Sequence, residues 1–519
     1  MSAALAATGS PFPIPTIEYS AILPILIVLG AAVVSVLFEA LLPQRARRNA
    51  QLVLVFVALV ASFAAVIASR GAHEVVAMGS VAVDGPALFM QGTILVLAFI
   101  AALVMAERKV DPAGDGFAPR ASALPGSEDE QAFTRLGWLQ TEVWPLFLFS
   151  VGGMLLFPAS NDLLTMFVAL EVLSLPLYIL AGLARRRRLL SQEASLKYFV
   201  LGAFSSAFFL YGTAMLYGFA GTVSISGIAD ALRTSSGSGL VLAGVALLSV
   251  GLLFKIGAAP FHQWTPDVYQ GSPTSVTAFM AACTKVAAFG ALLRVLYVAF
   301  GGIRWDWRPM MYVIAGLTMI VGTLFALTQT DIKRMLAYSS IAQAGFMLVG
   351  VVATSKAGLD GTLVYLLAYG IATIGAFAIV TLVRDSTGEA THLSQWAGLG
   401  KRSPLVASAF ALFLLAFAGI PLTSGFTGKF AVFTAGIAGG ATPIVVLGVV
   451  ASAVAAFFYV RVIVLMFFNE PSAEGGPSVV VPSSFTTLAI AVTVALTLFI
   501  GILPQTVLNL VEQAGLFVR

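Results

Sequence analysis

Runs of about 20 apolar residues, separated by short polar breaks, recur along the whole 519-residue chain. A run of this length crosses the ~30 Å hydrocarbon core of a bilayer as one helix, whereas a membrane β-strand needs only about 10 residues. Charged residues make up 10% of the chain, against roughly 25% in a soluble domain. The pattern predicts an all-α polytopic membrane protein, and it excludes a soluble enzyme with one membrane anchor, a β-barrel and a disordered chain.

The runs predict about 14 transmembrane helices. None of the first 20 residues is Lys or Arg, so the chain does not open with the basic segment of a secretory signal peptide, and the first run is expected to be a membrane span. The centres of the predicted helices lie near Val33, Ala58, Val96, Phe149, Leu170, Phe209, Leu247, Lys285, Leu317, Phe346, Ile371, Pro421, Phe457 and Val494.

Basic residues are unequally divided between the two sets of alternate loops. The loops that follow the odd-numbered helices hold 16 of them, and the opposite loops hold 6. Because the richer side faces the cytoplasm, both termini are expected outside a bacterial plasma membrane. This use of basic residues, with a net charge of +4, indicates membrane orientation and no nucleic-acid partner. The loop over 107–140 is long and mixed in charge, and the sequence assigns it no role.

Residues that bind cofactors or metals are scarce. Cys283 is the only cysteine, and the histidines are His73, His262 and His392, which are far apart in the sequence. Neither a glycine-rich dinucleotide motif nor a P-loop occurs. We therefore expect no cofactor and no metal in this chain, and any redox chemistry is expected on partner proteins.

Charged residues inside the apolar runs are the informative part of the sequence. A charge at the bilayer centre costs about 2.5–3.5 kcal/mol on insertion scales, so it needs a partner or water. Glu171 lies about 14 Å past Asp162 along a helix, and Lys285 lies about 18 Å past Pro273, which places both near mid-depth. The basic residues within or at the edges of the runs are Lys197, Lys255, Lys285, Arg294, Lys429 and Arg461.

Two prolines interrupt the runs that carry Lys255 and Lys429. Pro260 and Pro421 lack the N–H that a helix needs, so each predicts a broken helix. Paired broken helices are typical of inverted-repeat transporters. We predict two inverted five-helix repeats, formed by helices 4–8 and 9–13. The corresponding units are 1–141 (helices 1–3 and the long loop), 142–300 (first repeat), 301–469 (second repeat) and 470–519 (helix 14).

These charged residues could have structural roles instead of forming a proton relay. Lys197 is close enough to the cytoplasmic interface for its ammonium to reach the headgroups. Arg294 and Arg461 fit structural pairs or anchors. The remaining buried charges could form a static ion network, but three lysines against the single Glu171 make a poor neutral cluster.

Four segments resemble the antiporter-like, proton-conducting membrane subunits of respiratory complex I. They are EASLKYFVLGAFSSAFFLYG, FKIGAAPFHQWTPDVYQGSPTSVTAFMAACTKVAAFGALLR, TDIKRMLAYSSIAQAGFML and GIPLTSGFTGKF, and the resemblance covers about residues 142–468. Within this family the chain is most similar to the subunit N branch. Lys285 and the Ser340–Gln343 stretch stand where the L and M branches carry histidines, and Lys429 stands where the M branch carries Glu.

The resemblance implies roles for individual residues. Glu171 and Lys255 would form a controlling ion pair, with Lys197 as an additional lysine nearby. Lys285 would be the central relay, and Lys429 would exchange a proton with one side of the membrane.

The resemblance also implies proton pumping driven by distant NADH-to-quinone electron transfer. FMN, iron–sulfur clusters and quinone would then lie on partner subunits, and the direct partners would be subunit M, small membrane subunits and lipids. Two other functions stay open: a subunit of a multisubunit cation/proton antiporter, and a non-conducting structural subunit. A small-molecule transporter is disfavoured because the sequence shows no further polar cluster.

Overall fold

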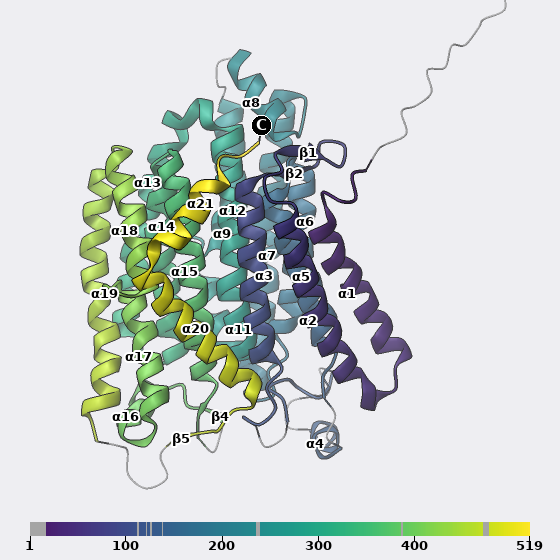
Figure 1. The fold of residues 1–519 in the computed structure, drawn as a ribbon, viewed down its shortest axis with the longest axis vertical. Coiled ribbons are helices and arrows are strands. Elements are labelled where there is room, and N and C mark those ends of the chain that lie inside the picture. Colours follow the sequence, from purple (N-terminus) through teal and green to yellow (C-terminus); the bar gives the residue numbers. More distant parts are fainter. Residues whose placement is uncertain are drawn as a thin grey trace, which may run out of the picture.

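Long helices that lie side by side in one bundle make up most of the described chain (Figure 1). The computed structural model describes residues 17–518, apart from 112–113, 121, 125–126, 137–138, 235–238, 386–387 and 471–476. By length and composition, 12 of the described helices could cross a membrane. The predicted all-α polytopic fold is therefore confirmed.

The described chain consists of α-helices with a few short 3-10 and π-helical turns and five short strands. The α-helices are α1 (Leu23–Leu41), α2 (Gln44–Ala68), α3 (Gly85–Met105), α4 (Glu128–Arg135), α5 (Val143–Leu156), α6 (Leu163–Ala181), α7 (Arg188–Ala220), α8 (Ile225–Thr234), α9 (Gly239–Ile256), α10 (Trp264–Gly271), α11 (Thr274–Phe279), α12 (Lys285–Arg294), α13 (Arg304–Thr328), α14 (Ile332–Val352), α15 (Lys356–Val380), α16 (Leu399–Arg402), α17 (Pro404–Ala418), α18 (Ser424–Ala438), α19 (Thr442–Phe468), α20 (Ser484–Ile502) and α21 (Pro504–Ala514). Short 3-10 turns are η1 (Phe157–Ala159), η4 (Gly301–Ile303) and η5 (Leu393–Trp396), and π-helical turns are η2 (Met280–Thr284) and η3 (Val295–Ala299). The strands β1 (Glu74–Val76) and β2 (Val81–Val83) form an antiparallel hairpin, and β3 (Val383–Asp385) lies between β4 (Gly388–Glu389) and β5 (Ser478–Val479).

All of the predicted helix centres fall within apolar helices, except Pro421, which lies in the break between α17 and α18. Besides the 12 long helices, the apolar segment Val143–Ala159 and the α17–α18 pair occupy the two remaining predicted positions. Each of these helices is shorter than a full span, so the total of 14 spans stays a prediction.

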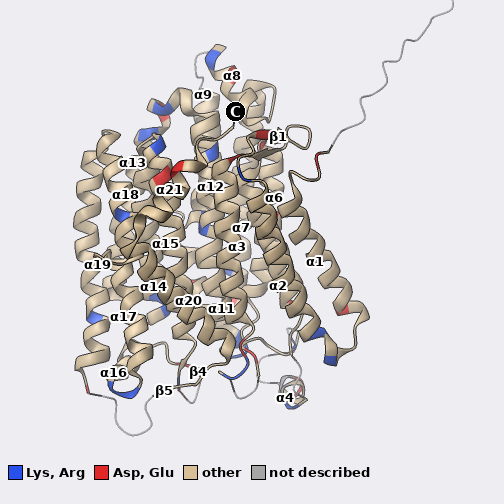
Figure 2. Cartoon of the chain, viewed as in Figure 1, with Lys and Arg blue, Asp and Glu red and all other residues tan. Residues whose placement is uncertain are grey.

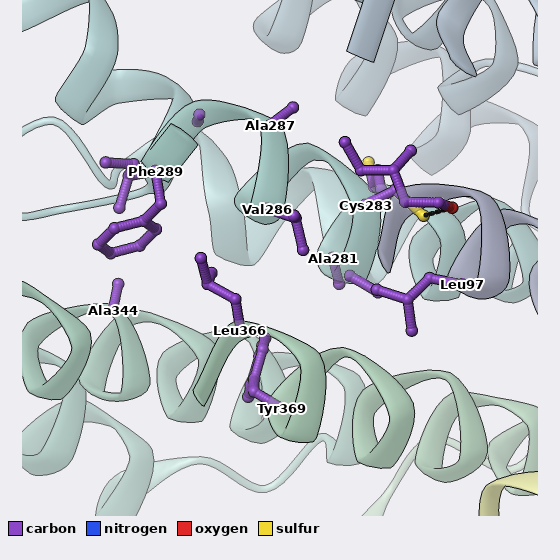
Figure 3. Close-up of a cluster of buried hydrophobic side chains, with 14 of the residues drawn as sticks. Leu97, Ala281, Cys283, Val286, Ala287, Phe289, Ala344, Leu366 and Tyr369 are labelled. Carbon is purple, nitrogen blue, oxygen red and sulfur yellow. Dashed lines mark hydrogen bonds between the residues drawn. The ribbon is translucent and has the colours of Figure 1, made fainter. Parts of the chain in front are cut away.

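Four helical segments form the centre of the bundle. All of the apolar window in 274–299 is buried, as is 94% of the windows in α14 and α15 and 83% of that in α3. Figure 3 shows Val286 and Phe289 of α12 directed toward Leu366 of α15 and Ala344 of α14. The segment over 274–299 also carries the buried polar side chains Thr277, Thr284 and Lys285, which would be costly to expose to lipid, and this explains its central position.

The two helix breaks have the same geometry. Gly257, after α9, and Gly419, after α17, both have positive φ values, +80° and +83°. Each of their amides donates to the carbonyls three and four residues back, at 3.0 Å. The next amide, of Ala258 or Ile420, donates to the carbonyl five residues back, at 3.0 and 3.1 Å. Glycine adopts this left-handed conformation without a Cβ penalty, so both helices stop in the same way.

Two helix starts are also alike. Asp162 and Asp331 each cap a helix with Oδ1, which accepts from the amides two and three residues ahead. Each aspartate also forms an isolated antiparallel bridge, to Ser224 and to His392 respectively. The first start lies near β2 and the second near β4, at opposite ends of the bundle in Figure 1. These matched features favour the predicted inverted repeats.

The long loop between α3 and α5 packs against the end of the bundle that carries α16 and β4 (Figure 1). Arg185 pairs with Asp115 at 2.8 Å, and Asp111 accepts from Arg186 at 3.1 Å and from Arg384 at 2.8 Å. Figure 2 shows basic residues at this end, near α16 and the turn between α1 and α2, and also at the opposite end, on α8 and around α13. The described part of the loop is therefore anchored to the bundle.

Candidate functional site

Lys285 lies in the centre of the bundle, at the first residue of α12 and directly after the π-helical turn η2. Its side chain is buried, with 3% of the residue exposed. The ammonium donates to the Ser340 carbonyl at 2.6 Å and to the Ser340 hydroxyl at 2.8 Å. The ring of Tyr369 lies 5.1 Å from Nζ, within the range of a cation–π contact.

Lys429, on α18, is held by the break that precedes its helix. Its ammonium donates to the carbonyls of Phe417 (2.8 Å) and Ala418 (3.1 Å) and to the Ser452 hydroxyl (2.7 Å). The two carbonyls are free to accept because α17 ends at Ala418. We call these three acceptors the Lys429 receptor. All three N–H donors of the ammonium are satisfied there.

A polar cluster that the sequence analysis did not assign lies between these two lysines. Gln343 Nε2 donates to the Phe417 carbonyl at 2.9 Å and to the Tyr459 hydroxyl at 3.3 Å, and its Oε1 accepts from the Tyr365 hydroxyl. Tyr459 also bonds to the Ser339 hydroxyl. Serine, tyrosine and glutamine carry no formal charge, so a search for intramembrane charges could not find them.

Lys255 and Glu171 are close but not in direct contact. The Lys255 ammonium is buried without a hydrogen-bond partner and faces the rings of Tyr178 (5.3 Å) and Tyr198 (5.1 Å). Glu171 Oε1 is likewise buried without a partner, and its charge acts on that of Lys255. The predicted ion pair is therefore not closed in this structure, because the two groups do not meet within hydrogen-bond distance.

Lys197 is bonded to carboxylates other than Glu171. Its ammonium bonds to Glu193 and to Asp267 of α10, both at 2.7 Å, and 42% of its side chain is exposed. Asp267 also accepts from Arg334 of α14 at 2.6 Å. Lys197 therefore links the second half of the broken helix to α7 instead of contacting Glu171.

The two arginines within the runs have structural partners. Arg294 is fully buried, and its Nη2 donates to both carboxylate oxygens of Asp84, each at 2.9 Å. Arg461 is exposed and donates to the Leu327 carbonyl. Both fit the structural role that the sequence analysis left open for them.

Pro260 and Pro421 lie in the two breaks, as predicted, between α9 and α10 and between α17 and α18. Lys255 comes two residues before the first left-handed glycine, and Lys429 contacts the second break directly. Within the described ranges, no three His, Cys, Asp or Glu side chains gather as metal ligands. The site that the structure brings together is thus built from lysines, hydroxyls and backbone carbonyls.

Comparisons with known proteins agree on one family. The family described as "NADH:quinone oxidoreductase/Mrp antiporter, TM" matches residues 160–455. A protein of Rhodococcus opacus named NADH-quinone oxidoreductase subunit N is 62% identical, over 99% of this chain and 98% of its own length. The Mycobacterium tuberculosis protein of the same name is 55% identical, over 98% of this chain and 99% of its own.

Solved structures share the whole fold. A chain of respiratory complex I from Thermus thermophilus is 33% identical with a TM-score of 0.75, covering 94% of this chain and 98% of that one. A chain of the Mrp complex from Dietzia is 24% identical with a TM-score of 0.79, covering 95% and 97%, which shows a common fold. The resemblance seen in the sequence is confirmed, and the chain belongs to the NADH-quinone oxidoreductase subunit N family, within the NADH:quinone oxidoreductase/Mrp antiporter family.

Proposed function

We propose that this chain is a proton-translocating membrane-arm subunit of an NADH-quinone oxidoreductase, and that protons move along Glu171, Lys255, Lys285 and Lys429. One observation carries the proposal: Lys255, Lys285 and Lys429 are all buried within a bundle of membrane-length helices. Buried intramembrane lysines are costly and mark ion or proton pathways. Lys197 joins the proposal as the lysine that links α7 to Asp267 in the second half of the first broken helix.

The environments of the three lysines suit different steps. Lys429 has three acceptors and Lys285 has two, so both sites can hold a charged ammonium. Lys255 has none, and Glu171 has an unsatisfied oxygen. Water between these two groups would satisfy both, and it would let the carboxylate control whether Lys255 is protonated.

The energies are of compatible size. Moving one charge through about 150 mV costs about 3.5 kcal/mol, at 2.3 kcal/mol per 100 mV. Bringing two opposite charges to 4 Å is worth about 4 kcal/mol at an effective dielectric of 20. Closing the open Glu171–Lys255 gap would therefore supply about the energy of one translocation step.

The proposal includes the location and the partners of the chain. The relatives bear the name of a quinone oxidoreductase subunit and come from bacteria. We place the chain in a bacterial plasma membrane with both termini outside, beside subunit M and small membrane subunits. FMN, iron–sulfur clusters and quinone would be bound by partner subunits. The exposed apolar faces of α1, α2, α7, α13 and α19 would contact lipids and these partners.

Replacing Lys285 tests the proposal. In the assembled complex in proteoliposomes, we expect Lys285→Met to lower the protons pumped per NADH oxidised by about tenfold or more, because the central donor is lost. Lys401→Met is the matched control, since Lys401 is an exposed lysine that pairs with Glu470. Unchanged stoichiometry in an intact Lys285→Met complex would refute the proposal.

The same vesicles separate the two alternatives. A cation/proton antiporter would exchange sodium for protons without NADH and would purify without redox subunits. A structural subunit would lose assembly in the Lys285→Met and Lys429→Met variants, but any complex that assembled would pump normally.

A further inference from the structure

We propose that Gln343 is a positioning residue that joins the Lys429 receptor to the turn of α14 that binds Lys285. The proposal rests on the proposed function above and extends it to a neutral side chain. In this view the carboxamide carries no proton itself. It fixes the groups between which protons pass.

The hydrogen bonds of Gln343 determine how its amide is oriented. The residue is 1% exposed. Its Nε2 uses two donors, to the Phe417 carbonyl (2.9 Å) and the Tyr459 hydroxyl (3.3 Å), and its Oε1 accepts from the Tyr365 hydroxyl. Reversing the amide would set its oxygen against the Phe417 carbonyl, which can only accept, whereas the two tyrosine hydroxyls can donate or accept. The side chain therefore has one favourable orientation.

The Phe417 carbonyl is shared between Gln343 and Lys429. It accepts from Gln343 Nε2 at 2.9 Å and from Lys429 Nζ at 2.8 Å. One carbonyl oxygen has two lone pairs, so both bonds form together. Because α17 stops one residue later, the Phe417 carbonyl has no partner within its own helix. Among the described hydrogen bonds, it accepts from Gln343 and from Lys429.

The other contacts of this turn reach Lys285. Ser340 and Gln343 are three residues apart on α14 and therefore lie on the same face of the helix. Ser340 accepts from Lys285, and Ser339 bonds to the same Tyr459 hydroxyl that Gln343 contacts. A single turn of α14 thus supplies the acceptor of Lys285, through Ser340, and contacts an acceptor of Lys429, the Phe417 carbonyl, through Gln343.

Substitutions at Gln343 separate positioning from proton carrying. Leucine would leave the Tyr365 and Tyr459 hydroxyls and the Phe417 carbonyl without this partner. Neutral histidine keeps one donor and one acceptor, so it can restore part of the contacts, and it titrates near pH 6.5.

In the complex in proteoliposomes, we expect Gln343→Leu to lower pumping per NADH by about fivefold or more, while NADH oxidation without a gradient continues. Gln343→His should recover most of the pumping and add to it a pH dependence between about 5.5 and 7.5, measured against the unsubstituted complex over the same range. The matched control is Gln91→Leu. Gln91 is a buried glutamine of α3 that donates to the Leu155 carbonyl, which is not one of the acceptors described for the three lysines.

Wild-type pumping by an assembled Gln343→Leu complex would overturn the inference, as would equal losses in Gln343→Leu and Gln91→Leu. If Gln343→Leu fails to assemble, Tyr459→Phe replaces it, because it removes one hydroxyl and keeps the ring. Normal pumping in Tyr459→Phe, with normal pumping in Gln343→His at every pH, would then refute the proposal. If Lys285→Met also pumps normally, the proposed function itself fails, which distinguishes the two outcomes.

Discussion

At the scale of single residues, the number of acceptors distinguishes the three buried lysines. Lys429 has three, Lys285 has two, and Lys255 has aromatic rings and a carboxylate that it does not contact. An ammonium without acceptors in an apolar interior is costly. The graded series indicates that Lys255 is the least stable of the three as a cation in this conformation, which suits a group that responds to Glu171.

The Lys429 receptor should distinguish lysine from arginine. We expect Lys429→Arg to lower pumping per NADH by about tenfold, although the charge is kept, because a planar guanidinium does not match three acceptors arranged around one nitrogen. The measurement is acidification of proteoliposomes, with Lys401→Arg as the control. Normal pumping by the arginine variant would show that charge alone is needed.

Sequence reasoning located the charged residues well and their contacts less well. Lys285 and Lys429 are buried as expected, since a lysine in the middle of an apolar run has few alternatives. The contact of Lys197 with Asp267 could not be foreseen, because the two residues are 70 positions apart and their meeting depends on how α10 folds back. In the sequence, the Ser340–Gln343 stretch stands out only for its lack of histidine, and nothing there shows that Gln343 would contact the Phe417 carbonyl 74 positions away.

At the scale of elements, the breaks determine where carbonyls become available. The same left-handed glycine ends α9 and α17, and in α17 the freed carbonyls bind Lys429. Proline pointed to both breaks in the sequence, because it cannot continue a helix. Gly257 and Gly419, which stand three residues before Pro260 and two before Pro421, are also expected at these breaks, and their left-handed conformation makes the turn itself.

Gly419 should be intolerant of a side chain for two reasons. Its φ of +83° disfavours other residues by about 1–2 kcal/mol, and an added Cβ would lie 2.8 Å from Lys429 Cδ. Gly440→Ala is the matched control, because Gly440 has a φ of +73° and nothing within 4 Å of an added Cβ.

We expect both glycine variants to lower the thermal stability of the purified complex slightly, but only Gly419→Ala to reduce pumping. An equal loss of pumping in the two variants would show that backbone strain, and not displacement of Lys429, causes the loss. Normal pumping in both would show that Gly419 tolerates a side chain.

At the scale of the whole molecule, a buried ion pair joins distant parts of the chain. Asp84 caps α3, pairs with Arg294 at the end of α12 and accepts from the Val518 amide at 2.9 Å, and the Arg294 guanidinium faces the Phe517 ring at 4.7 Å. Helix periodicity could not predict this junction, because its members come from three separate regions.

Removing one partner of this pair should be costly. We expect Asp84→Asn to destabilise the protein by about 3–5 kcal/mol, because it leaves a buried guanidinium without its counter-charge. Thermal unfolding of the purified complex measures the effect, with Asp230→Asn, at an exposed pair with Arg233, as the control. The double variant Asp84→Asn/Arg294→Met should recover part of the loss. If the double variant recovers no stability, Asp84 stabilises the protein only through the hydrogen bonds of its carboxylate to the backbone amides of Ala87 and Val518.

The π-helical turn before Lys285 makes the length of its helix critical. The segment over 274–299 is continuous, with η2 placed between α11 and α12. Each residue advances a helix by about 100°, so deleting a single residue from 280–284 would rotate one end of the segment by more than a quarter turn against the other. The Thr274 end and the Lys285 end could then no longer both face their present neighbours. Among related proteins, insertions and deletions should therefore be absent from this stretch, even where its side chains vary.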